Sequence, residues 1–160
     1  MGLYLKLFGN PKCYKWNLFL LHLAHKGLGI DQWKNMHISG ERYFLQHILP
    51  QKCRTIFDVG AYYGSYSKAA LNFHPAAKIY AFEPHPKSFM RLQQAAHTLN
   101  FSAYQQGLGS ECAIKQLHDY LHRDGSAQAS LYEGLFKTYN IPTVQHEITL
   151  RWISLRALGQ

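Results

Sequence analysis

Two glycines and an acidic residue lie close together where a short apolar segment ends. Asp58, Gly60 and Gly64 belong to the sequence DVGAYYG. Glycine lets a turn between a strand and a helix adopt backbone angles that a Cβ disfavours, and it leaves room for a ligand at the helix N-terminus. The spacing differs from the G-x-G-x-x-G of dinucleotide sites, because position 62 is tyrosine. An acid before the first glycine repels phosphate, so the segment favours a cationic or amino-bearing ligand.

A second acidic residue, Glu83, follows the next apolar segment. It lies about 20 residues after Gly64, the spacing at which dinucleotide folds place an acid on the ribose. A carboxylate there accepts hydrogen bonds from both ribose hydroxyls. S-adenosylmethionine carries a ribose, a sulfonium, an amino group and a carboxylate but no phosphate, so it suits both acids. The alternative is that Asp58 and Glu83 only cap loops.

Alternating strand and helix patterns surround these residues. Short runs of apolar, β-branched and aromatic residues predict strands over 55–59, 78–82 and 102–106, the last closed by Gly107 and Gly109. Helical periodicity predicts helices over 64–73 and 86–99. Strand–helix–strand–helix–strand order requires parallel strands with right-handed crossovers. We therefore expect an α/β protein with a Rossmann-like fold, an open and mainly parallel sheet with flanking helices.

Other elements are expected before and after this unit. Ser39 is a good N-cap for a helix over 40–49. Short strands are expected over 114–117 and 144–150. The polar, small-residue segment 124–132 is a candidate lid over a ligand.

Several segments together resemble the FkbM family of S-adenosylmethionine-dependent methyltransferases. They are SGERYFL (39–45), IFDVGAYYGSYS (56–67) and AFEPHPKSFMRL (81–92), supported by GSAQASL (125–131) and HEITL (146–150). The resemblance covers roughly residues 30–150. It implies a methyltransferase fold and an enzyme that transfers a methyl group from S-adenosylmethionine to a hydroxyl of a sugar or another small metabolite.

The resemblance also implies a cofactor site. The loop around the methionine part of the cofactor would be formed by Asp58, Gly60, Ala61 and Gly64. Glu83 would bind the ribose, and Pro84 and His85 would lie near the adenine. Gly107, Leu108 and Gly109 would border the adenine from the other side. Tyr62 departs from the family, which commonly has asparagine there, and no motif assigns a catalytic base.

The C-terminal end also departs from the family. Where the family continues with a strand carrying a K-I-D-x-E-G-type motif, this sequence has RWISLR (151–156) and ends at Gln160. We therefore expect a truncated methyltransferase domain over 39–160 behind a helical appendage over 1–38. Such a domain could be a remnant without turnover or a module that a partner chain completes. An exposed sheet edge would also favour self-association.

Composition restricts the remaining classes. The chain has 160 residues and a formal net charge of +8, spread without a run of lysine or arginine. A solvated basic surface is therefore favoured over a nucleic-acid methyltransferase or binder, which stays an alternative. Three cysteines without a C-x-x-C pair fit a reducing compartment, and no apolar run reaches the length of a membrane span. These features predict a cytoplasmic protein.

Two further patterns have open interpretations. A helix expected over 17–25 could dock on a partner, lie on a membrane or form an interface, and packing against the domain is favoured because its polar face is weakly charged. His118 and His122 would share one helix face and could hold a metal. No third ligand is placed with them, so surface histidines are favoured and no metal site is predicted.

Overall fold

A computed structural model of the chain describes residues 2–27, 36, 39–50 and 52–152. Contacts divide the chain into two compact units, Met1–Pro50 and Gln51–Gln160. The expected domain boundary falls beside residues 37 and 38, which lie outside the described residues, and it stays a prediction. Residues 153–160, where the sequence departs from the family motif, also lie outside them. Among the described helices, none has the length and apolarity needed to cross a membrane.

The first unit is helical. It contains α1 (Leu3–Phe8), the 3-10 turn η1 (Pro11–Cys13) and α2 (Tyr14–Gly27), followed by α3 (Glu41–Tyr43) and the π-helical turn η2 (Phe44–Ile48). Helix α2 contains the helix expected over 17–25 and extends it at both ends. No side chain of α2 is buried. The interpretation of α2 as a packing helix therefore finds no support within this unit.

The helix expected over 40–49 differs from the prediction. Its N-cap is Gly40, whose φ of +87° is left-handed, and Ser39 only accepts a long 3.5 Å hydrogen bond from the Glu41 amide through its Oγ. After α3 the chain continues as the π-helical turn η2. Of the apolar residues expected on this helix, only Leu45 is buried.

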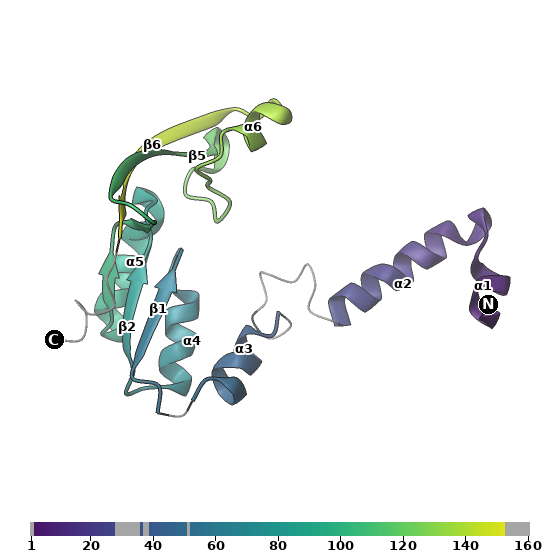
Figure 1. Cartoon of the computed structure of the whole chain (residues 1–160), viewed down its shortest axis with the longest axis horizontal. Helices are drawn as coiled ribbons and strands as arrows, with labels where there is room; N and C mark the ends of the chain where they lie inside the picture. Colours follow the sequence, from purple (N-terminus) through teal and green to yellow (C-terminus); the bar gives the residue numbers. More distant parts are fainter. Residues whose placement is uncertain (1, 28–35, 37–38, 51, 153–160) are drawn as a thin grey trace. The chain divides into compact units, whose positions relative to one another are not determined.

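The second unit begins with a parallel sheet. The strands β1 (Thr55–Val59), β2 (Lys78–Phe82) and β3 (Ser102–Tyr104) are adjacent in that order, with Val59 opposite Phe82. Helices α4 (Ser65–Phe73) and α5 (Pro86–Leu99) connect them (Figure 1). Because the strands follow one another in chain order, right-handed crossovers place both helices on one face. This arrangement confirms the predicted strand–helix–strand–helix–strand unit and is compatible with a Rossmann-like fold.

The two faces of this sheet differ in their cover. On the helix-covered face, Ala61, Ala81 and Leu92 form a buried cluster. On the other face, aromatic rings stack in rows, with Phe57 against Tyr80 at 5.5 Å and Phe82 against Tyr104 at 5.2 Å. Tyr104 is 37% exposed. Parallel sheets are usually covered on both faces, so this aromatic face is incompletely covered by the described residues. Among these residues, no strand pairs with the outer edge of β1.

A second sheet follows in the order β4-β6-β5. Strands β5 (Ala113–Tyr120) and β6 (Thr143–Arg151) form a long antiparallel ladder, and β4 (Gly107–Leu108) pairs with β6 in parallel. These strands contain the short strands expected over 114–117 and 144–150. Between β5 and β6 the chain forms η3 (Leu121–Arg123), the 124–132 segment and α6 (Gly134–Thr138).

The third predicted strand, 102–106, is wrong at its C-terminal end. Strand β3 stops at Tyr104, whose carbonyl accepts a hydrogen bond from the Gln106 amide at 3.0 Å. This turn redirects the chain, so Gly107 begins β4 of the second sheet and does not close the first. The sequence shows an uninterrupted segment there because the change of sheet depends on β6, which comes much later in the chain.

Candidate functional site

The turn after β1 lies against the end of β2. The amides of Gly60 and Ala61 both donate to the carbonyl of Phe82, at 2.9 and 3.0 Å. Gly60 has a φ of +79°, and a Cβ added there would meet nothing within 4 Å. The turn is therefore fixed by its backbone, and Gly60 leaves open space beside it.

Gly64 is constrained in a different way. It is the N-cap of α4 with a φ of +81°. A Cβ there would lie 3.0 Å from Leu92 Cδ1 of α5 and 3.3 Å from the ring of Phe101. Glycine at this position therefore permits close packing of the α4 N-terminus against α5.

Asp58 lies under the first turn of α4. Its Oδ2 accepts hydrogen bonds from the Ser67 amide at 3.1 Å and from the Ser67 hydroxyl at 2.6 Å. Burial raises the pKa of Asp58 and outweighs the opposing effect of these two hydrogen bonds. The carboxylate thus satisfies a free amide at the helix N-terminus. This geometry matches the capping alternative for Asp58.

Glu83, directly after β2, is held by two backbone amides. Its Oε2 accepts from the Tyr62 amide at 2.9 Å and its Oε1 from the His85 amide at 2.8 Å. The residue is 7% exposed. Burial raises the pKa of Glu83 above the usual glutamate value, although the two amides and His85 act in the opposite direction. The bonds fix the carboxylate between the turn after β1 and the start of α5.

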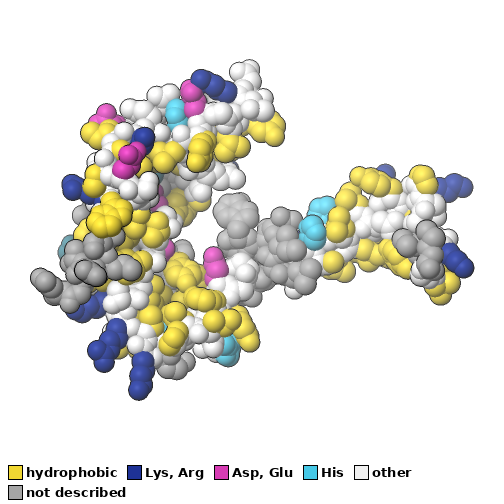
Figure 2. All heavy atoms as spheres, in the orientation of Figure 1, with side chains coloured by type: hydrophobic (Ala, Val, Ile, Leu, Met, Phe, Trp, Pro, Cys, Tyr) yellow, Lys and Arg dark blue, Asp and Glu magenta, His cyan; other side chains and the backbone are white. Residues whose placement is uncertain are grey.

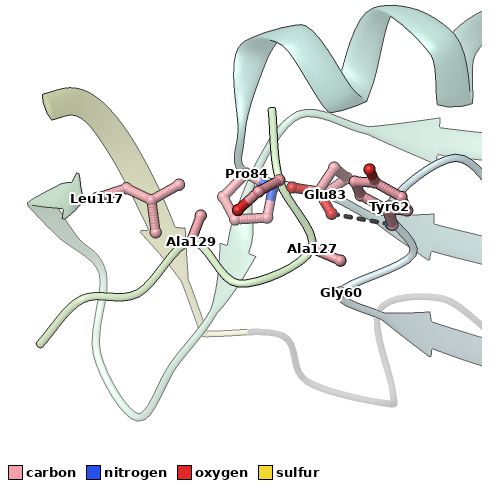
Figure 3. A pocket seen from close by; sticks show the side chains of 8 residues that line it. Gly60, Tyr62, Glu83, Pro84, Leu117, Ala127 and Ala129 are labelled. Atoms are coloured by element: carbon pink, nitrogen blue, oxygen red, sulfur yellow. Dashed lines mark hydrogen bonds between the residues drawn. The ribbon is translucent and has the colours of Figure 1, made fainter. Parts of the chain in front are cut away.

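A cavity of about 160 Å³ opens beside this carboxylate. Gly60, Tyr62, Glu83 and Pro84 line one part of it, as Figure 3 shows. Leu117 of β5 and the 124–132 segment, which contributes Ser126, Ala127 and Ala129, line the rest. The segment that the sequence suggested as a lid therefore forms a wall of the cavity.

A second hollow, of about 350 Å³, shares Gly60, Pro84, Leu117 and Ala129 with the first. Its walls are largely apolar and include Gly107 and Leu108. A Cβ on Gly107 would lie 2.6 Å from Leu150 Cδ2, so only glycine lets β4 approach β6 this closely. The predicted residues Gly60, Glu83, Pro84, Gly107 and Leu108 thus lie around two adjoining hollows.

The other predicted site residues lie behind these walls. Ala61 belongs to the buried core, Asp58 caps α4, and Gly64 packs against α5. His85 is 1% exposed and forms the N-cap of α5, where its Nδ1 accepts from the Lys87 amide at 3.2 Å. Its place beside an adenine stays a prediction.

The His85 ring belongs to a polar cluster that the sequence did not indicate. Its Nε2 lies 3.0 Å from Asp124 Oδ1 and 3.3 Å from Asp119 Oδ2. His146 Nε2 reaches the same Asp124 oxygen at 2.7 Å, and Lys87 Nζ lies 2.6 Å from Asp124 Oδ2. Burial alone raises the pKa of Asp124, but Lys87 and His146 together lower it to about 2. Asp124 therefore ties the beginning of the 124–132 segment to α5 and β6.

Asp119 at the end of β5 organises the same segment from within. This fully buried carboxylate accepts hydrogen bonds from the amides of Gly125 and Ser126 at 2.7 and 2.8 Å and from the Ser126 hydroxyl at 2.5 Å. An aspartate at the end of an amphipathic strand carries no distinctive sequence signal. Only the buried position of Asp119 in the folded chain reveals that it shapes the cavity wall.

The cluster also bears on metal binding. The ligand atoms of His85, Asp124 and His146 all lie within 4.8 Å of one another. Because Nδ1 of His85 accepts a hydrogen bond from the Lys87 amide, the ring proton belongs on Nε2, where a metal would need the lone pair. The Lys87 ammonium already pairs with the other oxygen of Asp124. The donor set therefore fits a hydrogen-bond network better than a cation.

The predicted pairing of His118 and His122 on one helix face is wrong. His118 lies in β5 and His122 in η3, so the two do not share a helix. His118 is also buried and is not a surface residue. The helical spacing of two residues is meaningful only if the segment is a helix, and pairing with β6 makes it a strand.

Tyr62 has a left-handed backbone at the position where the resemblance led us to expect asparagine. Its φ of +51° is left-handed, a conformation that asparagine adopts more readily than most residues. The Tyr62 ring stacks on Tyr63 with the centroids 3.6 Å apart, and Arg91 covers the Tyr63 ring at 4.5 Å. Burial, followed by the effect of Tyr63, raises the pKa of Tyr62 to about 12. Tyr62 therefore gives the cavity an aromatic border, and Tyr63 stacks behind it.

Comparison with known proteins gives one distant relative. The chain is similar to the 31-O-demethyl-FK506 methyltransferase FkbM of Streptomyces tacrolimicus, with 27% identity over 124 residues. The match covers 71% of this chain and 48% of the relative, so the chain spans about half the length of the curated protein it matches. No family model matches the sequence. The similarity supports a relationship to methyltransferases.

Proposed function

We propose that this chain carries the cofactor site of an FkbM-type methyltransferase, which transfers a methyl group from S-adenosylmethionine to a hydroxyl of a sugar or another small metabolite. The observation that carries the proposal is Glu83, a buried carboxylate fixed by two backbone amides beside a cavity. The distant similarity to a methyltransferase supports the same reaction class.

The residues around the two hollows suit this cofactor. Glu83 can accept hydrogen bonds from ribose hydroxyls with the lone pairs that its two amide partners leave free. The space beside Gly60 allows a ligand to approach the backbone closely. The apolar second hollow, bordered by Pro84, Gly107 and Leu108, offers a surface for a flat base. Asp58 and Asp119 act indirectly, since they position the turn and the 124–132 segment.

Methyl transfer mainly requires the protein to align the acceptor with the methyl group. Glu83 would hold the ribose of the cofactor, which would supply a methyl group on a sulfonium that is activated for displacement. Transfer to an acceptor hydroxyl would leave S-adenosylhomocysteine, and the hydroxyl proton would pass to a base or to water. The protein contributes by holding the two reactants in line and by excluding water around them.

A second candidate function is cofactor binding without turnover. The ionisable side chains that line the first cavity are Glu83 and Tyr62. In this proposal Glu83 is occupied by the ribose, and the pKa of Tyr62 is raised to about 12, so neither supplies a base at neutral pH. A module that depends on a partner chain for its base would show this arrangement. The truncation expected from the sequence, which would also leave such a module, remains a prediction.

Calorimetric titration of the folded chain with S-adenosylhomocysteine tests the cofactor site. We expect saturable binding that Glu83→Gln weakens by about tenfold or more, because a hydrogen bond to a charged group is lost. Glu111→Gln is the matched control, since Glu111 is exposed and, among the described residues, pairs with Lys115. A folded chain that binds nothing contradicts the site, and full affinity in the Glu83→Gln variant contradicts the role in ribose binding.

Turnover separates the two candidates. Release of S-adenosylhomocysteine from S-adenosylmethionine, in the presence of hydroxylated acceptors, supports the enzyme. Binding without release, restored by a second protein, supports the partner-dependent module. The lining of both hollows contains no lysine or arginine, so the site does not favour the nucleic-acid alternative. RNA binding with a steep salt dependence would revive it.

A further inference from the structure

The two N-terminal helices form a preorganised hairpin. Asn17 of α2 accepts a 2.5 Å hydrogen bond from the Tyr4 hydroxyl and donates one to the Phe8 carbonyl at 2.9 Å. The rings of Tyr4 and Phe8 pack 5.1 Å apart within α1. Asn10 caps the intervening turn by accepting from the Lys12 amide at 3.0 Å. The polar groups that join the helices are therefore satisfied internally.

The apolar side chains of this hairpin are exposed. No side chain of α2 is buried, and Figure 2 shows apolar side chains spread over both helices. The exposed large apolar residues are Leu3, Tyr4, Leu7, Tyr14, Trp16, Leu18, Phe19, Leu21 and Leu23. So many large apolar side chains exposed on two short helices are unusual for a protein surface in water and mark a binding surface.

The charges of the hairpin have one sign. Residues 1–30 contain four lysines and no aspartate or glutamate. His22 and Lys26 follow Lys15 by seven and eleven residues, which is close to two and three helical turns. The three side chains therefore form one stripe along α2. The stripe is narrow, and Phe19, Leu23 and Trp16 occupy the adjoining helix surface. The weak charge of this stripe made packing the favoured interpretation from the sequence. Because no side chain of α2 is buried, the combination of basic and exposed apolar side chains instead fits a helix that lies in a membrane interface.

We propose that the α1–α2 hairpin binds the surface of a bilayer that contains anionic lipid. Lysines attract the anionic headgroups, while leucine and aromatic side chains enter the boundary between headgroups and acyl chains. Nucleic acid would match the charge but offers no aliphatic surface for the five exposed leucines. The helices do not meet the requirements for crossing a membrane, so the hairpin lies along the surface.

Sedimentation of the full chain with vesicles tests this proposal. We expect the chain to bind vesicles of phosphatidylcholine with phosphatidylserine and to bind phosphatidylcholine alone much more weakly. With Trp33 and Trp152 replaced by phenylalanine, Trp16 is the sole tryptophan. Its fluorescence should then shift to shorter wavelength when the anionic vesicles are added, because the ring leaves water.

Paired substitutions separate charge from apolar contact. Lys15→Gln with Lys26→Gln should weaken binding to the anionic vesicles by about fivefold per lysine. The matched control, Lys52→Gln with Lys78→Gln, changes two exposed lysines of the other unit and should leave binding unchanged. Phe19→Ser with Leu23→Ser should abolish the fluorescence shift. Leu135→Ser, at an exposed side chain of α6, should not. Circular dichroism verifies that each variant is folded.

Three results would overturn the proposal. They are failure of the folded chain to sediment with anionic vesicles, equal binding to both vesicle types, and equal loss in the control lysine variant. Binding to RNA or to an acidic protein that the Lys15 and Lys26 variant abolishes, without vesicle binding, would assign the hairpin to that partner instead. None of these results depends on the cofactor site in the other unit.

Discussion

Glu83 is both buried and fixed by two amides, and its protonation should therefore control cofactor binding. Its raised pKa means that the carboxylate takes up a proton at a higher pH than an ordinary glutamate. Ribose hydroxyls need the charged form as acceptor. We expect the affinity for S-adenosylhomocysteine to fall as the pH is lowered, with onset above the normal glutamate range. Calorimetry across pH checks this, and the decline should be absent in Glu83→Gln.

Gly60 and Gly64 form a natural comparison, because their φ angles are nearly equal and their surroundings differ. Gly60→Ala adds only the strain of a left-handed residue, about 1 kcal/mol, since nothing lies within 4 Å of the new Cβ. Gly64→Ala adds a contact 3.0 Å from Leu92 and should cost roughly 2–4 kcal/mol. Urea unfolding of both variants measures the difference. Equal losses would show that packing at Gly64 adjusts freely.

Among elements, the 124–132 segment depends most on a single buried side chain. Asp119→Asn replaces an acceptor of three hydrogen bonds from Gly125 and Ser126 with an amide that cannot accept through its nitrogen. We expect faster amide exchange at these two residues and weaker cofactor binding, because Ser126 lines the cavity. Glu147→Gln, at an exposed position of β6, serves as control. Unchanged exchange in Asp119→Asn would mean that the segment is held elsewhere.

The link between this segment and α5 should also show in the pH dependence of stability. The pKa of Asp124 is lowered to about 2 in the folded chain, against about 3.9 for an unfolded aspartate. Its stabilising effect is then fully present above about pH 4 and is lost as the pH falls towards 2. The difference in melting temperature between the wild type and Asp124→Asn should shrink over this range. A difference that stays constant down to pH 2 would contradict the ion pairing.

At the scale of the whole molecule, the incompletely covered sheet predicts association. The outer edge of β1 has no described partner strand, and Phe57, Tyr80 and Tyr104 line the aromatic face. Size-exclusion chromatography should give a mass above the 18.5 kDa of one chain. Phe57→Lys should reduce association by placing a charge on the edge strand, whereas Gln145→Lys on β6 should not. A monodisperse wild-type monomer with cooperative melting would refute this prediction.

The parts of the structure that local sequence patterns control were predictable. Strand β1, helix α4, strand β2 and helix α5 follow from apolar periodicity and from the glycine and proline residues between them. The proximity of Gly60 and Glu83 follows too, because adjacent parallel strands end at the same edge of a sheet. The resemblance to methyltransferases uses these same segments. The cofactor, the truncation and the cytoplasmic location remain predictions.

What the tertiary structure decided depends on pairing between distant segments. The ladder between β5 and β6 makes His118 a strand residue, moves Gly107 into a second sheet, and helps to bring Asp119, Asp124 and His146 towards the start of α5. No local pattern encodes these contacts, since each needs two segments far apart in the chain to be in register. The exposure of α2 within its own unit is another result of the tertiary structure. Periodicity shows which side chains share a helix face, but only the structure shows that no described part of this unit buries them.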